Sequence, residues 1–185
     1  ADAVTLYTHW YSSTPTEGLK YVVDAFGTNR NYYYQVVGGV ARIRQVTDGT
    51  GSVTSTFDAN GNLATRRDRN GTQTTYTHDL ARNLEISRTE AYGTALARTI
   101  TTQWHSAYRL PTKIVAPSGV AGSSEVTDYA YDAQGNLLRK SVTAGGTTRQ
   151  WVMTYDTAGR VLTVDGPRTD VADVTTYTYY GATDP

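Results

Sequence analysis

A short phrase recurs along this chain and limits what the chain can fold into. It consists of an aromatic residue, Asp, two further residues, Gly, Asn or Arg, and an aliphatic residue. Clear copies occupy residues 57–63, 131–137 and 155–161. A phrase that recurs at a regular distance is typical of stacked repeats rather than of a single catalytic centre. The recurrence therefore favours a continuous repeat architecture.

Degenerate copies fill the intervals between the clear ones. Residues 78–84 keep the Asp, Asn and Leu positions but carry Arg82 in place of Gly, and residues 104–110 lack both Asp and Gly. Residues 175–180 approach a further copy. The key positions 58, 79, 105, 132, 156 and 180 lie 21, 26, 27, 24 and 24 residues apart. The departures from the phrase predict bulkier or longer loops at Arg82, His105 and Tyr108.

Turn chemistry explains the phrase. Asp at the first position of a type I turn accepts hydrogen bonds from backbone N–H groups two or three residues further on. Gly at the fourth position enters the left-handed region and closes a hairpin. The aromatic residue before the turn and the aliphatic residue after it then meet across two strands. The predicted structural turn residues are Asp58, Gly61, Asp132, Gly135, Asp156 and Gly159.

A second series of turn signals lies between the copies. It comprises residues 48–51, 68–71, 117–119, 145–146 and 165–167. The segments between turns alternate in character, as in 127–131, where the tyrosines share one face of a strand. Short strands at this spacing predict an all-β fold of antiparallel hairpin repeats that form a curved or spiralling sheet. The best helix candidate, 80–98, is weakened by Gly93 and its Thr residues.

Two regions are expected. Residues 46–185 contain the β-hairpin repeats, and residues 1–45 are less regular. The turn signal at 24–27 and the tyrosines at 32–34 favour degenerate repeats for this irregular β segment, with a separate small cap as the alternative.

Composition removes several classes of function. The 17 basic and 17 acidic residues leave no net charge, whereas nucleic-acid binders normally carry a basic surplus. The absence of cysteine excludes disulfides and thiolate metal sites. No apolar stretch approaches the ~20 residues of a membrane span. The 32 threonines and 15 tyrosines suit a pleated, half-buried surface.

The Asp, Asn and His residues give little support to a catalytic or metal-binding site. A glycosidase needs two facing carboxylates, but Asp58, Asp132 and Asp156 each stand where a turn requires Asp. The Asp- and Asn-rich turns at 58–62 and 68–71 lack the spacing and terminal Glu of an EF-hand loop. The three histidines form no short-spaced ligand pair: His9, His78 and His105. We therefore expect no catalytic residue, no metal and no cofactor.

The tryptophans leave a binding alternative open. Trp104 and Trp151 are candidates for stacking against sugar rings, although aromatic residues that alternate along a strand more often line a packed face. Residues 70–72 fit a glycosylation acceptor, and a simple turn is the other interpretation.

The phrase resembles the YD repeat of the Rhs family. The family pattern is Tyr-Asp-x-x-Gly-Arg/Asn-Leu, followed by a Thr-rich strand, a second Gly turn and a further Tyr-x-Tyr-Asp. Residues 129–137, 155–161 and 57–63 carry the match, and recognisable copies extend over about 46–180. The resemblance implies a long β-sheet that spirals into a hollow shell. In bacterial Rhs proteins and similar insecticidal toxin-complex components the shell encloses a toxic domain, and in teneurins it belongs to a cell-adhesion ectodomain.

The resemblance sets the functional expectation. It implies a non-catalytic segment of a shell that encloses a toxin or other polypeptide cargo, secreted or at the cell surface. The alternative is an extracellular adhesin or carbohydrate-binding module of β-repeats, and an enzyme has the least support. An open sheet exposes unpaired edges. The expected partners are therefore the rest of a larger Rhs polypeptide or further copies joined edge to edge, with cargo or glycan as ligands.

Overall fold

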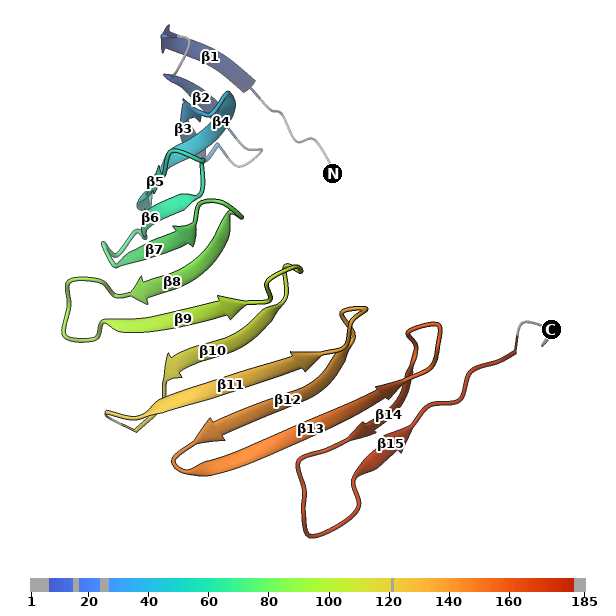
Figure 1. Ribbon diagram of the computed structural model, residues 1–185. Coiled ribbons are helices and arrows are strands. Elements are labelled where there is room, and N and C mark those ends of the chain that lie inside the picture. The colour runs from blue at the N-terminus through green and yellow to red at the C-terminus, as the bar shows by residue number, and fades with distance from the viewer. Residues whose placement is uncertain (1–6, 15–16, 24–26, 121, 182–185) are drawn as a thin grey trace. The chain divides into compact units, whose positions relative to one another are not determined.

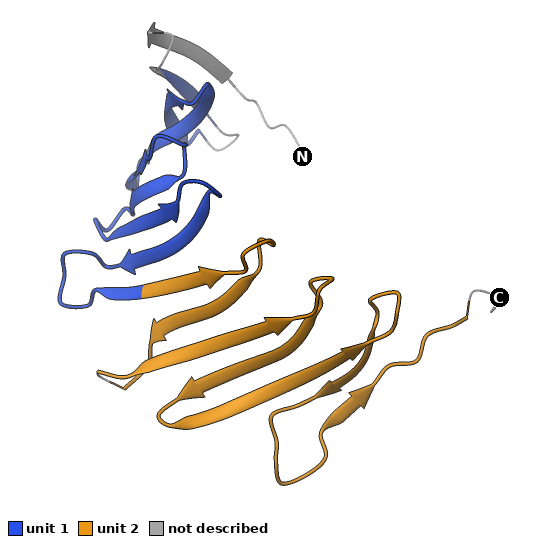
Figure 2. Cartoon of the chain, viewed as in Figure 1, with its two compact units in different colours: residues 1–99 blue, residues 100–185 orange. Residues whose placement is uncertain are grey.

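The computed structural model describes residues 7–14, 17–23, 27–120 and 122–181, with side chains from residue 18 onward. Most of the turn predicted at 24–27 and the side chains of His9 and Trp10 lie outside the described residues. The chain divides into two compact units, residues 1–99 and 100–185 (Figure 2).

The described residues form strands and turns without a helix (Figure 1). The strands of the first unit are β1 (Tyr7–Thr14), β2 (Glu17–Val23), β3 (Asn29–Val37), β4 (Val40–Asp48), β5 (Gly51–Phe57), β6 (Leu63–Arg67), β7 (Gln73–Asp79) and β8 (Leu84–Glu90). β9 (Arg98–Trp104) crosses the division between the units. The second unit continues with β10 (Pro111–Pro117), β11 (Ser124–Tyr131), β12 (Leu137–Ala144), β13 (Thr147–Tyr155), β14 (Val161–Asp165) and β15 (Val174–Thr176). Nowhere in these residues is there a helix capable of crossing a membrane.

Within each unit the strands pair in chain order, each with the next. The pairing is antiparallel in both units, as in β5 with β6 and β11 with β12. The helix candidate at 80–98 is mostly β8 and the turns beside it, because its Thr and Gly residues favour extended and turn conformations. The prediction of an all-β fold built from antiparallel hairpins is confirmed.

The repeated phrase occupies one series of turns within each unit. It closes β5–β6 and β7–β8 in the first unit, and β9–β10, β11–β12 and β13–β14 in the second (Figure 1). The second series of turns closes the opposite ends of the same strands. Each repeat is therefore a hairpin plus the connection to the next hairpin.

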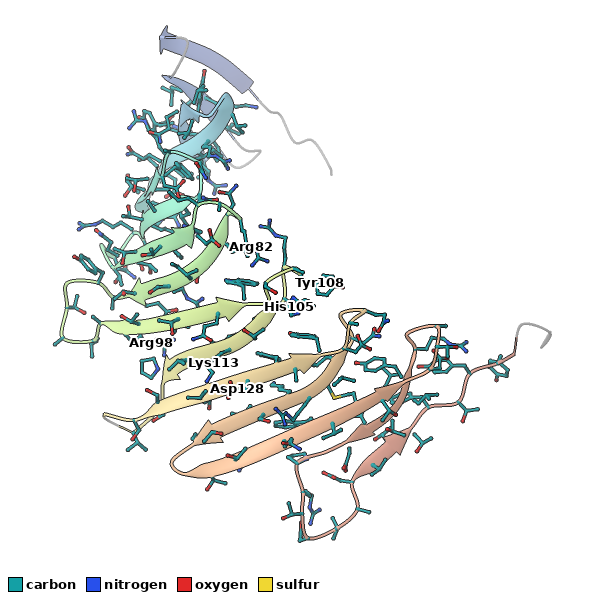
Figure 3. All side chains as sticks on the ribbon, in the orientation of Figure 1. Arg82, Arg98, His105, Tyr108, Lys113 and Asp128 are labelled. Atoms are coloured by element: carbon teal, nitrogen blue, oxygen red, sulfur yellow. The ribbon has the colours of Figure 1, made fainter. Side chains whose placement is uncertain are left out.

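The two faces of the second unit differ in chemistry. Tyr129, Lys140 and Trp151 are register partners on one face of β11, β12 and β13. Asp128 lies on the other face and forms an ion pair with Lys113, with 3.2 Å between Lys113 Nζ and Asp128 Oδ1 (Figure 3). Asp128 and Tyr129 thus lie on opposite faces of β11, as the alternation requires.

Very little of the sheet is deeply buried. Among the described hydrophobic residues only Leu84 and Ile100 fall below a tenth exposed, at 4% and 6%. Most strand residues are half-buried because neighbouring side chains on the same face cover them. Lateral contacts between repeats, rather than a second layer, therefore supply the packing.

Hydroxyl pairs join adjacent strands and involve nine of the 32 threonines. Thr56 and Thr65 face each other across β5 and β6 with their Oγ1 atoms 2.8 Å apart. Thr154 and Thr163 do the same across β13 and β14 at 2.6 Å. Further pairs are Thr47–Ser52, Thr89–Thr99 and Thr143–Thr148, each at 2.8 Å. Cross-strand hydroxyl bonds of this kind help to fix strand register.

Candidate functional site

The aspartate of each clear copy organises its own turn. Asp132 Oδ1 accepts hydrogen bonds from the backbone N–H groups of Gln134 at 2.9 Å and Asn136 at 2.8 Å. Its backbone carbonyl accepts from the N–H of Gly135 at 3.1 Å. The carboxylate therefore accepts hydrogen bonds from the backbone N–H groups two and four residues further on. The N–H group three residues further on donates to the backbone carbonyl of the aspartate. Asp58 and Asp156 make the same set.

The glycine of each clear copy adopts a conformation that other residues avoid. Gly135 has a φ of 89°, and Gly61 and Gly159 have values of 77° and 79°. All three lie in the left-handed region, where an L-residue costs about 1–2 kcal/mol. After the turn, the aromatic residue meets the aliphatic residue with a register shift that marks a bulge. The pairs are Phe57–Leu63, Tyr131–Leu137 and Tyr155–Val161.

The tyrosine hydroxyl of a copy reaches back to the copy before it. The Tyr131 hydroxyl donates to the Pro111 carbonyl at 2.9 Å, and the Tyr155 hydroxyl donates to the Leu137 carbonyl at 2.9 Å. The Tyr179 hydroxyl donates to the Val161 carbonyl at 2.8 Å. Pro111, Leu137 and Val161 each begin the strand after a turn. We call Tyr131, Tyr155 and Tyr179 the tyrosine row. Their hydroxyls form hydrogen bonds between successive repeats rather than within one repeat.

Sequence reasoning did not find the tyrosine row. It assigned the aromatic residue to contact across its own hairpin, which is correct for the ring but leaves the hydroxyl without a role. The signal was the choice of Tyr over Phe in two of the three clear copies and at Tyr179. Burial raises the pKa of Tyr131, with a smaller contribution from Tyr129, so the hydroxyl stays protonated and can donate.

Replacing Tyr155 by Phe tests the tyrosine row. The substitution keeps the ring and removes only the donor to Leu137, so we expect a loss of about 1 kcal/mol in the free energy of unfolding. Tyr180→Phe is the matched control, because Tyr180 is 88% exposed and no described residue bonds its hydroxyl. Urea unfolding followed by circular dichroism measures both. Equal stabilities for the two variants would contradict the assigned bond.

Hydrogen bonds keep the turn carboxylates ionised. The Asn136 side-chain amide donates to Asp132 at 2.8 Å, and this bond is the main cause that lowers the pKa of Asp132. The backbone N–H of Arg160, followed by its guanidinium, lowers the pKa of Asp156. A carboxylate that stays ionised and already accepts several donors is poorly suited to protonate a substrate. The arrangement supports turn closure rather than acid–base catalysis.

The degenerate copy at 78–84 closes without glycine. Asn83 adopts a φ of 51° in the left-handed region, which Asn tolerates better than most residues. The Ala81 N–H donates to Asp79 Oδ1 at 3.0 Å, so the aspartate keeps its role. Asp79 pairs directly with Leu84, which leaves only residues 80–83 between them. Of the bulkier or longer loop expected at Arg82, the longer alternative is wrong, because Asn83 supplies the backbone freedom that Gly supplies elsewhere.

The copy at 104–110 replaces the aspartate by a histidine. His105 Nδ1 accepts from the backbone N–H groups of Ala107 and Tyr108, both at 3.1 Å. The imidazole stacks on the Tyr108 ring with 4.9 Å between centroids, and the Tyr108 hydroxyl donates to the Ala133 carbonyl of the next turn at 2.6 Å (Figure 3). Residues 105–110 lie between paired Trp104 and Pro111, so this loop is longer than the five-residue loop at 58–62, as expected.

The described histidines do not assemble a metal site. His78 Nδ1 lies 3.8 Å from Asp58 Oδ2, and His105 serves its own turn. No cluster of three His, Asp or Glu side chains with ligand geometry occurs in the described part of the chain. The candidate metal chemistry therefore has no geometric support there.

The tryptophan candidates lie on strands and remain a prediction. Trp104 ends β9 opposite Pro111, and Trp151 lies in β13 opposite Lys140. The Lys140 ammonium lies 5.3 Å from the centroid of the Trp151 ring, in a cation–π arrangement. A sugar ring stacked on that face has to displace the lysine.

A groove of about 670 Å³ lies between the turns of two successive copies in the second unit. Leu138, Met153 and Tyr155 contribute to its lining, together with Asp132 and Asp156. The two carboxylates already accept the hydrogen bonds of their own turns. The remaining polar lining comes from Gln134, Asn136, Thr154 and Thr157.

Comparison with known proteins points to one family. A family model described as RHS Repeat matches residues 57–95 and 131–171, which contain the clear copies of the phrase. The fold is similar to that of a chain in the Tc holotoxin pore of Photorhabdus luminescens, solved as a TccC3 mutant, with a TM-score of 0.66 and 14% identity. The likeness covers 84% of this chain and 9% of that chain. No curated protein matches.

Proposed function

We propose, from the premise that this chain belongs to the Rhs repeat family, that it is a non-catalytic wall segment of an Rhs-type shell that encloses a toxin or other polypeptide cargo. The observation that carries the proposal is the linkage of each repeat to the one before it. Within each unit the strands pair in chain order, and the hydroxyls of Tyr131, Tyr155 and Tyr179 bond back to the preceding copies. Such a pattern extends a wall by adding repeats.

The chemistry of the turn aspartates and of the sheet faces also favours a wall segment. The repeated aspartates, which are the main candidates for catalysis, accept hydrogen bonds from the N–H groups of their own turns through Oδ1. Only Leu84 and Ile100 are deeply buried among the described hydrophobic residues, so each unit offers broad half-buried faces to a neighbour or a cargo. We treat residues 1–45 as degenerate repeats of the same wall, since β1 to β4 pair as hairpins.

The proposal extends to partners and location. β15 spans only Val174–Thr176, and all three residues are exposed. An exposed strand of this kind presents unpaired backbone groups to a further strand. We therefore place the chain within a larger Rhs polypeptide or an edge-to-edge assembly, secreted or at the surface of a bacterium. The glycan-binding alternative has less support, because Lys140 covers one face of Trp151.

Electron microscopy of the longest polypeptide that contains this chain tests the proposal. We expect a closed hollow particle whose internal segment resists added protease. A compact solid particle or a filament would contradict enclosure. A glycan array distinguishes the alternative: saturable binding that is lost in Trp151→Ala supports an adhesin, whereas a wall segment shows none.

A further inference from the structure

Two turns of the first unit have the same backbone and the same Asn-Gly sequence. In the turn at 58–62, the Asn60 N–H donates to Asp58 Oδ1 at 2.9 Å and the Gly61 N–H donates to the Asp58 carbonyl at 2.9 Å. In the turn at 68–72 the corresponding bonds from Asn70 and Gly71 to Asp68 are both 3.0 Å. The glycine φ values are 77° and 83°. The two turns therefore form a matched pair.

The two asparagine side chains differ in what they bind. The Asn60 amide nitrogen donates to the Leu80 carbonyl at 2.7 Å and to Asn83 Oδ1 at 3.0 Å, and both acceptors belong to the next copy of the phrase. The Asn70 side chain is exposed and has no hydrogen-bond partner among the described residues. Two hydrogen bonds thus hold the Asn60 side chain to the next copy, whereas no hydrogen bond to a described residue restrains the Asn70 side chain.

We propose that Asn70 is a site of spontaneous succinimide formation and deamidation, and that Asn60 is protected from it. The Gly71 N–H leaves its hydrogen bond to the Asp68 carbonyl, as the Gly61 N–H must also do in the turn at 58–62. The Gly71 nitrogen then loses its proton to solvent base and bonds to Asn70 Cγ, and the amide nitrogen leaves as ammonia. Water then opens the ring at either carbonyl, which yields an aspartyl or an isoaspartyl residue. Gly71 carries no Cβ to hinder the attack, and a Cβ placed there meets nothing within 4 Å.

The freedom of the Asn70 side chain allows Cγ to approach the nitrogen of Gly71. At Asn60 the same rotation requires both amide hydrogen bonds to break.

The isoaspartyl product also changes the backbone of the proposed wall. An isoaspartyl residue lengthens the main chain within the turn that joins β6 and β7, where the Asp68 N–H bonds to the Thr72 carbonyl at 3.0 Å. Modification at position 70 is therefore expected to loosen one hairpin.

Hydroxylamine cleavage and peptide mass mapping measure the two sites in one sample. Hydroxylamine cuts the chain at succinimides, so cleavage after Asn70 gives fragments 1–70 and 71–185, and cleavage after Asn60 gives 1–60 and 61–185. In the folded protein we expect modification at Asn70 to be roughly tenfold faster, the factor that one or two hydrogen bonds supply. In denaturing urea the two rates should converge. Equal rates in the folded protein would overturn the proposal.

Asn83→Gly tests the origin of the protection. Glycine keeps the left-handed backbone at this position and removes the side-chain oxygen that accepts from Asn60. We expect faster modification at Asn60 and an unchanged rate at Asn70, with an unaltered circular dichroism spectrum. The Leu80 carbonyl remains as the second acceptor of the Asn60 amide in this variant. If the rate at Asn60 stays at the wild-type value, the bond to Asn83 contributes nothing to the protection, and its part in the proposal is overturned.

Discussion

Valine at Gly135 or Gly159 is expected to destabilise the hairpin repeats by about 1–3 kcal/mol at each position, because a β-branched residue is forced into the left-handed region. The φ values are 89° and 79°. Space is not the obstacle, since a Cβ at Gly135 lies 3.5 Å from the nearest side-chain atom, Leu110 Cδ1. The expected result for the double variant is loss of cooperative unfolding in urea, followed by circular dichroism.

Two substitutions separate the backbone effect from added bulk. Gly119 has open space around it and no left-handed φ, so Gly119→Val should remain close to wild type. Gly135→Asn should fall between valine and wild type, because Asn83 already adopts this conformation in the copy at 78–84. If Gly135→Val and Gly159→Val unfold at the same urea concentration as Gly119→Val, the turns do not depend on glycine.

The hairpins could be predicted from sequence because their causes are local. Asp132, Gly135 and the strand residues beside them lie within seven positions, and each acts through its own turn chemistry. The all-β fold then follows from the spacing between such turns. Turns of this kind can be predicted from the sequence without knowledge of which repeats become neighbours.

Bonds between repeats could not be predicted in the same way. The Tyr155 hydroxyl reaches the carbonyl of Leu137, and the Asn60 amide reaches the carbonyl of Leu80, so each depends on the register of two separate hairpins. His105 is a different case. Its imidazole nitrogen replaces a carboxylate as the acceptor for the turn, and a motif defined by Asp does not include that substitution.

Leu84→Ala should have the largest effect of any hydrophobic truncation in the first unit. Leu84 opens β8 next to the turn at 79–83 and is only 4% exposed, the one described hydrophobic residue of this unit below a tenth. Removing a buried leucine side chain costs about 2–5 kcal/mol, depending on how far the surroundings collapse. Few of the described side chains are buried, and a loss of this size is a large part of a typical domain stability of about 5–15 kcal/mol.

Leu96→Ala is the matched control, since Leu96 lies in the same unit at 82% exposure. Its truncation should change the free energy of unfolding by less than about 0.5 kcal/mol. Urea titrations of the two variants provide the comparison. A Leu84→Ala midpoint that coincides with that of Leu96→Ala would show that lateral hydrogen bonds such as Thr56–Thr65, rather than this buried contact, hold the repeats together. The expected difference instead identifies Leu84, beside a degenerate turn, as the largest single hydrophobic contribution to the stability of this unit.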